Sequence, residues 1–414
     1  MGTITQRGID DLPIMEEFDR PDFGTDFGWV TADLFTRPYK GLMRTSWGDV
    51  VVYSNADLAA LRAHPGSTHQ PIDVMFESFG DVDKSGLNRL FGANTFSWQP
   101  PVHKPGKQLL MRLFTPKSVG RFHDTFVQIV RTLLDDAIAR EQVDFVKDVA
   151  RPAVAQFWSH VLGLTVEEAT ELVHLAGQVQ ASFTLRPSRD VIVRSNTSAH
   201  EYMDLLNASM SRAAAGGEYP LLTELVAEYA TMDDLGRPAD PFVHLGAALI
   251  DGFHTLGAIL SSVVYALLEA GLQPEATDRP VMSFATAAYQ EGVRLHSAIT
   301  ALSRWAVEDF VYDDVLIPRG TNIQMAWLLG NRDPEVFDDP ATYRLDRANR
   351  VKQFSFGGGF YVCAGRSVVQ ALSEVLLAEL AGNSIAVELA GEARWDPASL
   401  LHELKALPVA LRRR

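Results

Sequence analysis

The sequence predicts a mainly α-helical protein with a small β region. Long stretches repeat apolar residues at helical spacing, while short β-rich runs, GDVVVYS at 48–54 and LPVALRRR at 407–414, lie towards the two ends of the chain. No linker, repeat or low-complexity segment interrupts the 414 residues, and a hydrophobic share of 47% is ample for a large core.

Four stretches show the helical spacing most clearly. In 124–140, 201–216 and 367–382, apolar residues recur every three or four positions, so each helix should bury one face. The stretch 244–270, HLGAALIDGFHTLGAILSSVVYALLEA, is apolar on nearly every face. We expect that helix to be buried on all sides.

Cys363 is the only cysteine of the chain, and it lies in the string FSFGGGFYVCAGR at 354–366. One cysteine makes neither an internal disulfide nor a thiolate zinc cage, which leaves a buried apolar role, a nucleophile or a solitary metal ligand. The glycines allow close approach to a flat group, and the helix that follows places the sulfur near a helix N-terminus, where a thiolate is favoured. With Phe356 close by, this arrangement suits axial ligation of haem iron.

The string from Phe356 to Gly365 resembles the haem-binding loop of the cytochrome P450 family, F-G-x-G-x-x-x-C-x-G. In that loop the cysteine is the proximal iron ligand. The resemblance implies that haem b, iron protoporphyrin IX, is bound through Cys363, with Phe356, Gly357 and Gly365 beside it. Tyr361 stands where the family usually has His or Arg.

Two further motifs precede this loop in the family's order. YQEGVRL contains Glu291 and Arg294, which lie three apart on one helical face and can therefore pair. The resemblance makes them a structural triad with Arg347 of YRLDR. It also implies that Arg304 holds a haem propionate.

The stretch WQPPVHKPGKQLLMRLF resembles the family's C helix, where a His and an Arg face the propionates. His103 matches, whereas Lys107 replaces the Arg and offers positive charge without a planar fork. Because proline is tolerated only in the first turn of a helix, Pro105 predicts that this helix begins near His103 or Lys104.

These motifs imply the cytochrome P450 fold, a single helix-rich unit with a small β region. Such a unit accounts for residues 1–414 as one domain, although length alone would favour two or three domains. The resemblance runs from about residue 95 to the C-terminus and is loosest in 1–95.

The buried helix 244–270 carries DGFHT where the family usually has A/G-G-x-D/E-T. Thr255 takes the place of the alcohol and His254 that of the acid, while Asp251 occupies a normally small position. Asp251 and Thr255 lie about 40° apart round a helix axis and should share the haem-facing side. His254 points aside, about 100° from Thr255, so it is either a neutral core histidine or a proton relay.

Asp251 needs a partner, because a carboxylate in an apolar helix costs several kcal/mol unless it is paired or protonated. Three partners stay open: a cationic group of the substrate, His254, or a chain of water molecules. By position against the family, five residues could line the pocket or simply fill the core: Trp98, Phe183, Leu185, Ile299 and Leu302. His64 and His69 lie in a polar loop without ligand spacing, and we expect them at the surface.

The formal net charge of −15 argues against nucleic-acid binding. The N-terminus lacks a signal-peptide pattern, its Met-Gly start lacks the Ser or Thr of a myristoylation site, and the apolar stretches read as too short and interrupted to span a membrane. We therefore expect a cytoplasmic protein without a membrane partner. Local basic residues border the face where an acidic ferredoxin docks in the family: Lys104, Lys107, Arg112, Lys117, Arg121 and Arg366.

The resemblance implies a soluble bacterial haem-thiolate monooxygenase that inserts one oxygen atom from O2 into a small organic substrate, by hydroxylation or epoxidation, as in natural-product tailoring. A ferredoxin and its reductase would supply electrons, and Thr255, with His254 or Asp251, would deliver protons. Because the usual acid is missing, a peroxide-using or oxidative-coupling haem enzyme is one alternative. Others are a non-catalytic haem protein that binds a ligand and an unrelated helical binding protein.

Overall fold

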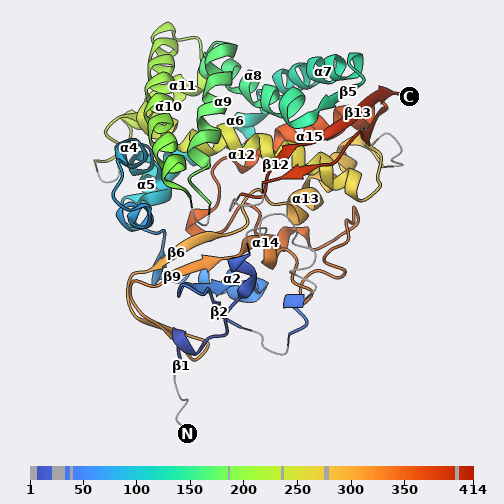
Figure 1. Cartoon of the computed structure of the whole chain (residues 1–414). Helices are drawn as coiled ribbons and strands as arrows, with labels where there is room; N and C mark the ends of the chain where they lie inside the picture. Colours follow the sequence, from blue (N-terminus) through green and yellow to red (C-terminus); the bar gives the residue numbers. More distant parts are fainter. Residues whose placement is uncertain are drawn as a thin grey trace.

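The computed structural model describes residues 7–20, 33–37, 41–184, 187–234, 237–274, 279–396 and 401–414. Helices dominate these residues and short strands form small sheets, which confirms the predicted fold class (Figure 1). The α-helices are α2 (Asn55–Leu61), α3 (Ile72–Met75), α4 (Ser85–Ala93), α5 (His103–Leu113), α6 (Pro116–Gly120), α7 (His123–Ala139), α8 (Arg151–Leu162), α9 (Val166–Gln180), α10 (Arg189–Gly216), α11 (Pro220–Ala230), α12 (Pro241–Glu269), α13 (Val281–Leu295), α14 (Trp327–Gly330) and α15 (Arg366–Gly382).

The strands form four small sheets among the described residues. Their orders are β2-β3-β9-β6-β4, β10-β13-β5, β1-β8-β7 and β11-β12. The strands are β1 (Arg7–Gly8), β2 (Met43–Arg44), β3 (Val50–Val52), β4 (Ser67–Thr68), β5 (Gln142–Asp144), β6 (Leu302–Ala306), β7 (Phe310–Tyr312), β8 (Val315–Ile317), β9 (Asn322–Met325), β10 (Ile385–Leu389), β11 (Arg394–Trp395), β12 (Leu404–Ala406) and β13 (Pro408–Arg413).

The elements expected from the sequence are present. The four helical stretches correspond to α7, α10, α12 and α15, and the two β-rich runs contain β3 and β13. In Figure 1, helices such as α10 and α12 occupy the upper part of the molecule, and β2, β6 and β9 lie below them. The helix carrying His103 begins at that residue, as Pro105 predicted, because a proline at its third position leaves the ladder of hydrogen bonds intact.

Two apolar clusters meet near the cysteine loop. The larger cluster packs the helices together and includes much of α12, whereas a second cluster lies against the five-stranded sheet. Phe354 belongs to the second cluster, and Phe356 packs against the first. The loop that follows them is therefore held at the junction between the helices and the sheet.

The start of α12 is fixed by capping. The side chain of Asp240 accepts hydrogen bonds from the backbone N–H groups of Phe242 at 2.8 Å and Val243 at 3.2 Å. Pro241 occupies the first turn, where it needs no N–H partner. From there the helix runs for 29 residues through the protein.

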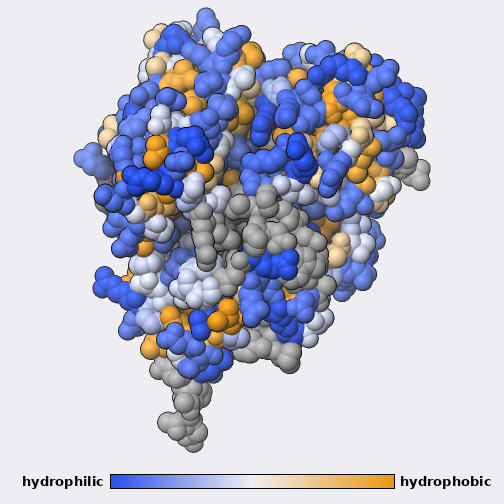
Figure 2. All heavy atoms as spheres, viewed as in Figure 1, coloured by the Kyte–Doolittle hydropathy of each residue, from blue (hydrophilic) through white to orange (hydrophobic). Residues whose placement is uncertain are grey.

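The length and composition of α12 would allow it to cross a membrane. The expectation that every apolar stretch is too short and interrupted for this was wrong for α12, because its few charged residues do not outweigh the apolar ones. However, 72% of the relevant window is buried inside the protein, so neighbouring helices already cover this apolar surface. The face shown in Figure 2 is mostly hydrophilic, with apolar side chains in separate patches.

The predicted triad forms a buried ionic network. Arg294 Nη2 lies 2.7 Å from Glu291 Oε1, and both side chains are completely buried. Arg347 Nε donates to the same carboxylate at 2.8 Å, and Arg294 also donates to three backbone carbonyls in the segment 331–342. Burial disfavours the carboxylate, but the two guanidinium groups outweigh it and hold the pKa of Glu291 below its usual value.

We expect Glu291→Gln to lower the free energy of unfolding by about 3–5 kcal/mol, because it leaves two buried guanidinium groups without a counter-charge. The midpoint of urea denaturation measures the change. Arg344→Gln is the matched control, since among the described residues the Arg344 side chain pairs with Asp346 alone, at the surface, and we expect its midpoint to be nearly that of the wild type. Equal midpoints for Glu291→Gln and the control would contradict this account.

Candidate functional site

The cysteine loop is positioned by hydrogen bonds from the network around α13. The backbone carbonyl of Asn331 accepts a hydrogen bond from Arg294. The side chain of Asn331 binds the start of the loop: its Oδ1 accepts from the Phe354 N–H at 2.6 Å, and its Nδ2 donates to Ser355 Oγ at 2.9 Å. Ser355 Oγ in turn donates to the Val293 carbonyl at 2.7 Å. This chain of contacts links the buried ion pair to the first residues of the loop.

The glycines of the loop have separate conformational roles. Gly357 and Gly359 have φ of +66° and +65°, in the left-handed region that disfavours other residues. A Cβ on Gly358 would lie 2.4 Å from Arg62 Nη1. The turn closes where the Cys363 N–H donates to the Phe356 carbonyl at 3.0 Å.

The surroundings of Cys363 only partly favour a thiolate. Burial raises the pKa of its thiol, while the positive charge of Lys107 and the backbone N–H groups of Gly365 and Arg366 lower it. The predicted effect of the helix N-terminus is therefore present, but burial outweighs it. A metal cation bonded to the sulfur would reverse this balance, because a coordinating thiol is deprotonated.

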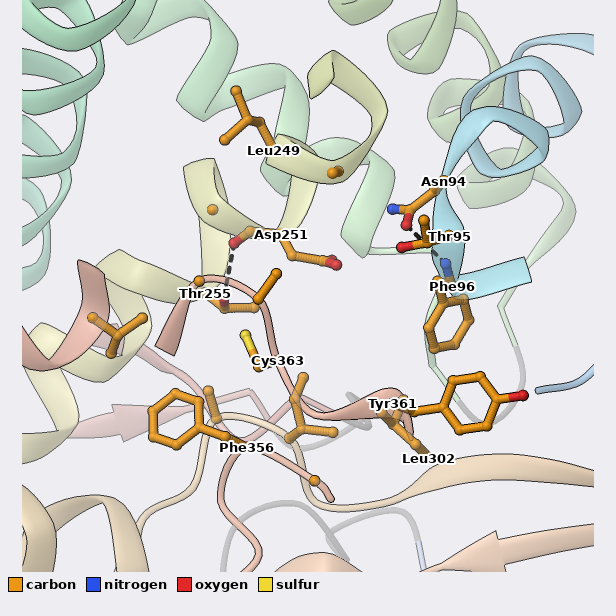
Figure 3. A pocket seen from close by; sticks show the side chains of 18 of the residues that line it. Asn94, Thr95, Phe96, Leu249, Asp251, Thr255, Leu302, Phe356, Tyr361 and Cys363 are labelled. Carbon is orange, nitrogen blue, oxygen red and sulfur yellow. Dashed lines mark hydrogen bonds between the residues drawn. The ribbon is translucent and has the colours of Figure 1, made fainter. Parts of the chain in front are cut away.

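Cys363 faces a cavity whose opposite wall is α12 (Figure 3). Asp251, Gly252 and Thr255 line this cavity from the helix, and Phe356, Gly357, Tyr361 and Gly365 line it with Cys363 from the loop. The remaining wall is largely apolar and includes a segment on the far side, Asn94, Thr95 and Phe96. The predicted residues on both sides thus surround one space.

Asp251 has a hydrogen-bond partner that sequence reasoning missed. Gln180, the last residue of α9, donates from Nε2 to Asp251 Oδ1 at 2.8 Å. Burial raises the pKa of Asp251, while the bond from Gln180 and the charges of His254 and Lys107 lower it. His254, one of the three partners left open by the sequence, acts on Asp251 only through its charge.

Thr255 is held by its own helix. Its Oγ1 donates to the Asp251 carbonyl at 2.7 Å, one turn earlier (Figure 3). Because that bond engages the hydroxyl proton, the lone pairs of Oγ1 are left to accept hydrogen bonds in the cavity. A side chain from α8 also holds this part of α12, since Trp158 Nε1 donates to the Gly252 carbonyl at 3.1 Å.

His254 does not line this cavity. It is buried on another side of α12, where its Nε2 lies 2.8 Å from Glu403 Oε2, and it borders a second pocket. Burial disfavours the Glu403 carboxylate, but the charges of His254 and Lys405 outweigh it and lower the pKa of Glu403 to about 2. Nothing in the sequence pattern links residues 149 positions apart in this way, so Glu403 was not anticipated.

A cluster of nitrogen groups lines the cavity beside the loop. Arg304 Nη1 donates to His69 Nδ1 at 3.0 Å, and the Arg304 guanidinium lies 4.6 Å from the centre of the Tyr361 ring. His103 and Lys107 line the same end of the cavity. Burial lowers the pKa of His103 to about 4, with the charges of Lys107 and Arg304 adding to this effect.

His69 is therefore a site residue and not the surface residue that was expected. It is 4% exposed, it lines the cavity, and its ring packs edge-on against Tyr361 at 3.8 Å between ring centres. The polar composition of its loop gave no signal of this, because the contact depends on Arg304 in β6. His64 is half-buried and stacks on Phe310.

Of the other residues predicted to line the pocket or fill the core, some line the cavity and others do not. Phe183, Ile299 and Leu302 line the cavity, whereas Trp98 does not and instead stacks on His244. Leu185 lies outside the described residues. Position in the sequence alone could not distinguish the residues that line the cavity from those that pack elsewhere.

The cavity residues fit a haem. Arg304 is 2% exposed, its Nε has no hydrogen-bond partner, and neither Arg304 nor Lys107 forms an ion pair among the described residues. Buried cations without carboxylates match the two propionates of a haem. A sulfur ligand, apolar walls and glycines on one side of the space match the flat ring and its iron.

Comparisons with known proteins agree with this geometry. The sequence model of the family described as Cytochrome P450 matches residues 264–380. Nocardicin C N-oxygenase of Nocardia uniformis subsp. tsuyamanensis is 29% identical over 76% of this chain and 78% of its own length. For 6-deoxyerythronolide B hydroxylase of Saccharopolyspora erythraea the identity is 25%, over 85% and 86%.

The solved structure of CalO2 superposes with a TM-score of 0.83 at 19% identity, covering 97% of this chain and 99% of CalO2. That likeness supports the fold along nearly the whole chain. Together with the family match, the named oxygenases and hydroxylases and the cysteine loop opposite α12, it leads to one conclusion. This chain belongs to the cytochrome P450 family, whose members are oxidoreductases that carry a haem bound through a cysteine thiolate.

Proposed function

We propose that this protein is a cytoplasmic monooxygenase, folded as one domain, that uses haem b and O2 to hydroxylate or epoxidise a small organic substrate. The observation that carries the proposal is a single cavity with Cys363 on one wall and Thr255 with Asp251 on the other. The names of two relatives, nocardicin C N-oxygenase and 6-deoxyerythronolide B hydroxylase, favour a natural-product substrate.

The residues of the loop side would hold the cofactor. Cys363 would ligate the iron, and Arg304, Lys107 and His103 would hold the propionates, with Tyr361 stacked beneath the Arg304 guanidinium. When bound, the haem supplies the centre at which O2 is reduced and split, helped by electron density from the thiolate.

The residues of α12 would handle protons and substrate. Thr255 Oγ1 would accept a hydrogen bond from a water molecule in the cavity, since its own proton is held by the Asp251 carbonyl. Asp251 supplies the only carboxyl group among the described residues that line the cavity. His254 lacks access to this space and is bound to Glu403, which favours a structural role for the histidine.

Electrons would come from an acidic ferredoxin that docks on basic residues. The expected cluster is smaller than the sequence indicated, because Arg112 pairs with Glu228, Arg121 pairs with Glu224 and Lys107 lines the cavity. Lys104, Lys117 and Arg366 are exposed and form no ion pair among the described residues. We propose these three as the docking cations, with α6 and α15 packed together beneath Lys117 and Arg366.

Cys363→Ser tests the ligand assignment. We expect the reduced carbon monoxide complex of the wild type to show the red-shifted Soret band of a thiolate ligand, and the variant to lose it. No other cysteine can replace the ligand, because the chain has only one. A red-shifted band in Cys363→Ser would refute the assignment.

Three variants test α12. With a ligand found by spectral screening, we expect Thr255→Ala and Asp251→Asn to lower the product formed per reducing equivalent by about tenfold and to release peroxide instead, because the first removes a hydroxyl group from the cavity and the second removes its negative charge. His254→Phe should keep most of the wild-type yield, since its ring lies outside the cavity.

A full yield in Asp251→Asn, or a larger loss in His254→Phe, would overturn this assignment. Good turnover with hydrogen peroxide alone, with weak dependence on ferredoxin, would instead indicate a peroxide-using enzyme. Slow oxygen chemistry with every ligand that shifts the spectrum would indicate a ligand-binding haem protein.

Lys117→Glu tests the docking site. We expect reduction by an acidic ferredoxin to slow by about tenfold at low ionic strength, with the difference shrinking as salt screens the charges, while substrate binding is unchanged. Arg194→Glu, an equal charge reversal at an exposed position of α10, is the control and should reduce at the wild-type rate. Equal rates for the two variants at every salt concentration would show that the ferredoxin docks elsewhere.

A further inference from the structure

The polar groups of the cavity are unevenly distributed. Its basic side chains, Arg304, Lys107, His103 and His69, belong to the cluster beside Tyr361. The α12 side has one carboxylate, Asp251, and no other acid lines the cavity in the described part of the chain. The cavity wall also includes several aromatic side chains: Phe91, Phe96, Phe114, Trp158 and Phe183.

The Asp251 carboxylate is only half satisfied. Oδ1 accepts the bond from Gln180, and among the described residues Oδ2 has no hydrogen-bond partner. In Figure 3 the side chain points into the space between α12 and the segment that carries Asn94 and Phe96. The residue is exposed although it lies deep in the protein, so its exposed surface is the cavity surface.

Among the residues that the structure describes, no cation forms an ion pair with this carboxylate. Lys107 lies near enough for a weak electrostatic effect but forms no ion pair with it, and it belongs to the cluster that fits the propionates. His254 turns instead to Glu403. An ionised carboxylate in an apolar cavity is unfavourable unless a cation accompanies it, and the open oxygen leaves room for that cation in the substrate.

We infer that the substrate is a hydrophobic molecule with a cationic amine, and that Asp251, oriented by Gln180, binds this amine in the aromatic part of the cavity. The faces of the aromatic rings add favourable interactions with a cation, and their area binds the apolar remainder. This assigns the Asp251 side chain to the substrate, so the loss of yield expected for Asp251→Asn would follow from a displaced substrate, and proton handling is left to Thr255. The inference rests on the proposed function, because it concerns the substrate of that same site.

A pair of probes of equal shape tests it. Phenylbutyl-trimethylammonium carries a permanent charge and has no lone pair for iron, and its neutral isostere has a tert-butyl group in place of the ammonium. Equilibrium dialysis with the haem-loaded protein gives a Kd for each probe at fixed ionic strength. The measured quantity is the ratio of the neutral to the cationic Kd, which cancels differences in shape.

We expect Asp251→Asn to lower this ratio at least about fivefold, since it removes charge and keeps size. Asp135→Asn makes the same change at an exposed residue of α7 that does not line the cavity, and should leave the ratio as in the wild type. Gln180→Met, which keeps the carboxylate but removes its hydrogen bond, should lower the ratio less than Asp251→Asn. If Asp251→Asn does not fold, Asp251→Ala replaces it with the same threshold.

A fall of less than about fivefold in the Asp251 variant, or an equal fall in Asp135→Asn, overturns the inference. The carbon monoxide spectrum separates this result from failure of the proposed function. If the wild type lacks the thiolate band, the proposed function fails whatever the ratio. If the band is present and the ratio does not respond to Asp251, only the amine assignment fails.

Discussion

The buried ion pair between Glu291 and Arg294 is the constraint on which the site depends. Two opposite charges with no exposed surface are stable only when nearly every donor and acceptor is used, and Arg294 meets this demand by binding backbone carbonyls far along the chain. One of them belongs to Asn331, whose side chain binds the start of the cysteine loop. The position of Cys363 therefore follows from how a guanidinium in α13 is satisfied.

The wall of the cavity opposite the cysteine loop is α12, and its position is fixed by different contacts. The middle of α12 is apolar and gains its position from packing, but side chains of other elements also bind its carbonyls: Asn94 at Ala247 and Trp158 at Gly252. Such bonds restrain both rotation and sliding of the helix. Asp251 and Thr255 consequently face the cysteine loop, while His254, on the next side of the same turn, is directed into the protein interior.

Much of this arrangement could be predicted from the sequence, where the evidence is local. The turn geometry of the glycine loop, the first residue of α5 and the division of Asp251 from His254 all follow from bond angles and helical periodicity. Gln180, Glu403 and His69 could not be found in this way. Each acts through a partner about 70 to 240 positions away, and single-sequence patterns carry no record of such contacts.

The separation of charge across the cavity has a chemical consequence. Cations gathered at one end attract the negative groups of a cofactor, and one open carboxylate at the other end attracts a positive group of a substrate. A ligand with an amine would therefore enter with a preferred orientation, before any apolar contact distinguishes one carbon from another. With the amine fixed at Asp251 and the thiolate fixed by the α13 network, the carbon presented to the reactive centre is set by its distance from the nitrogen. Regioselectivity would then depend on the length of the substrate as much as on the shape of the aromatic wall.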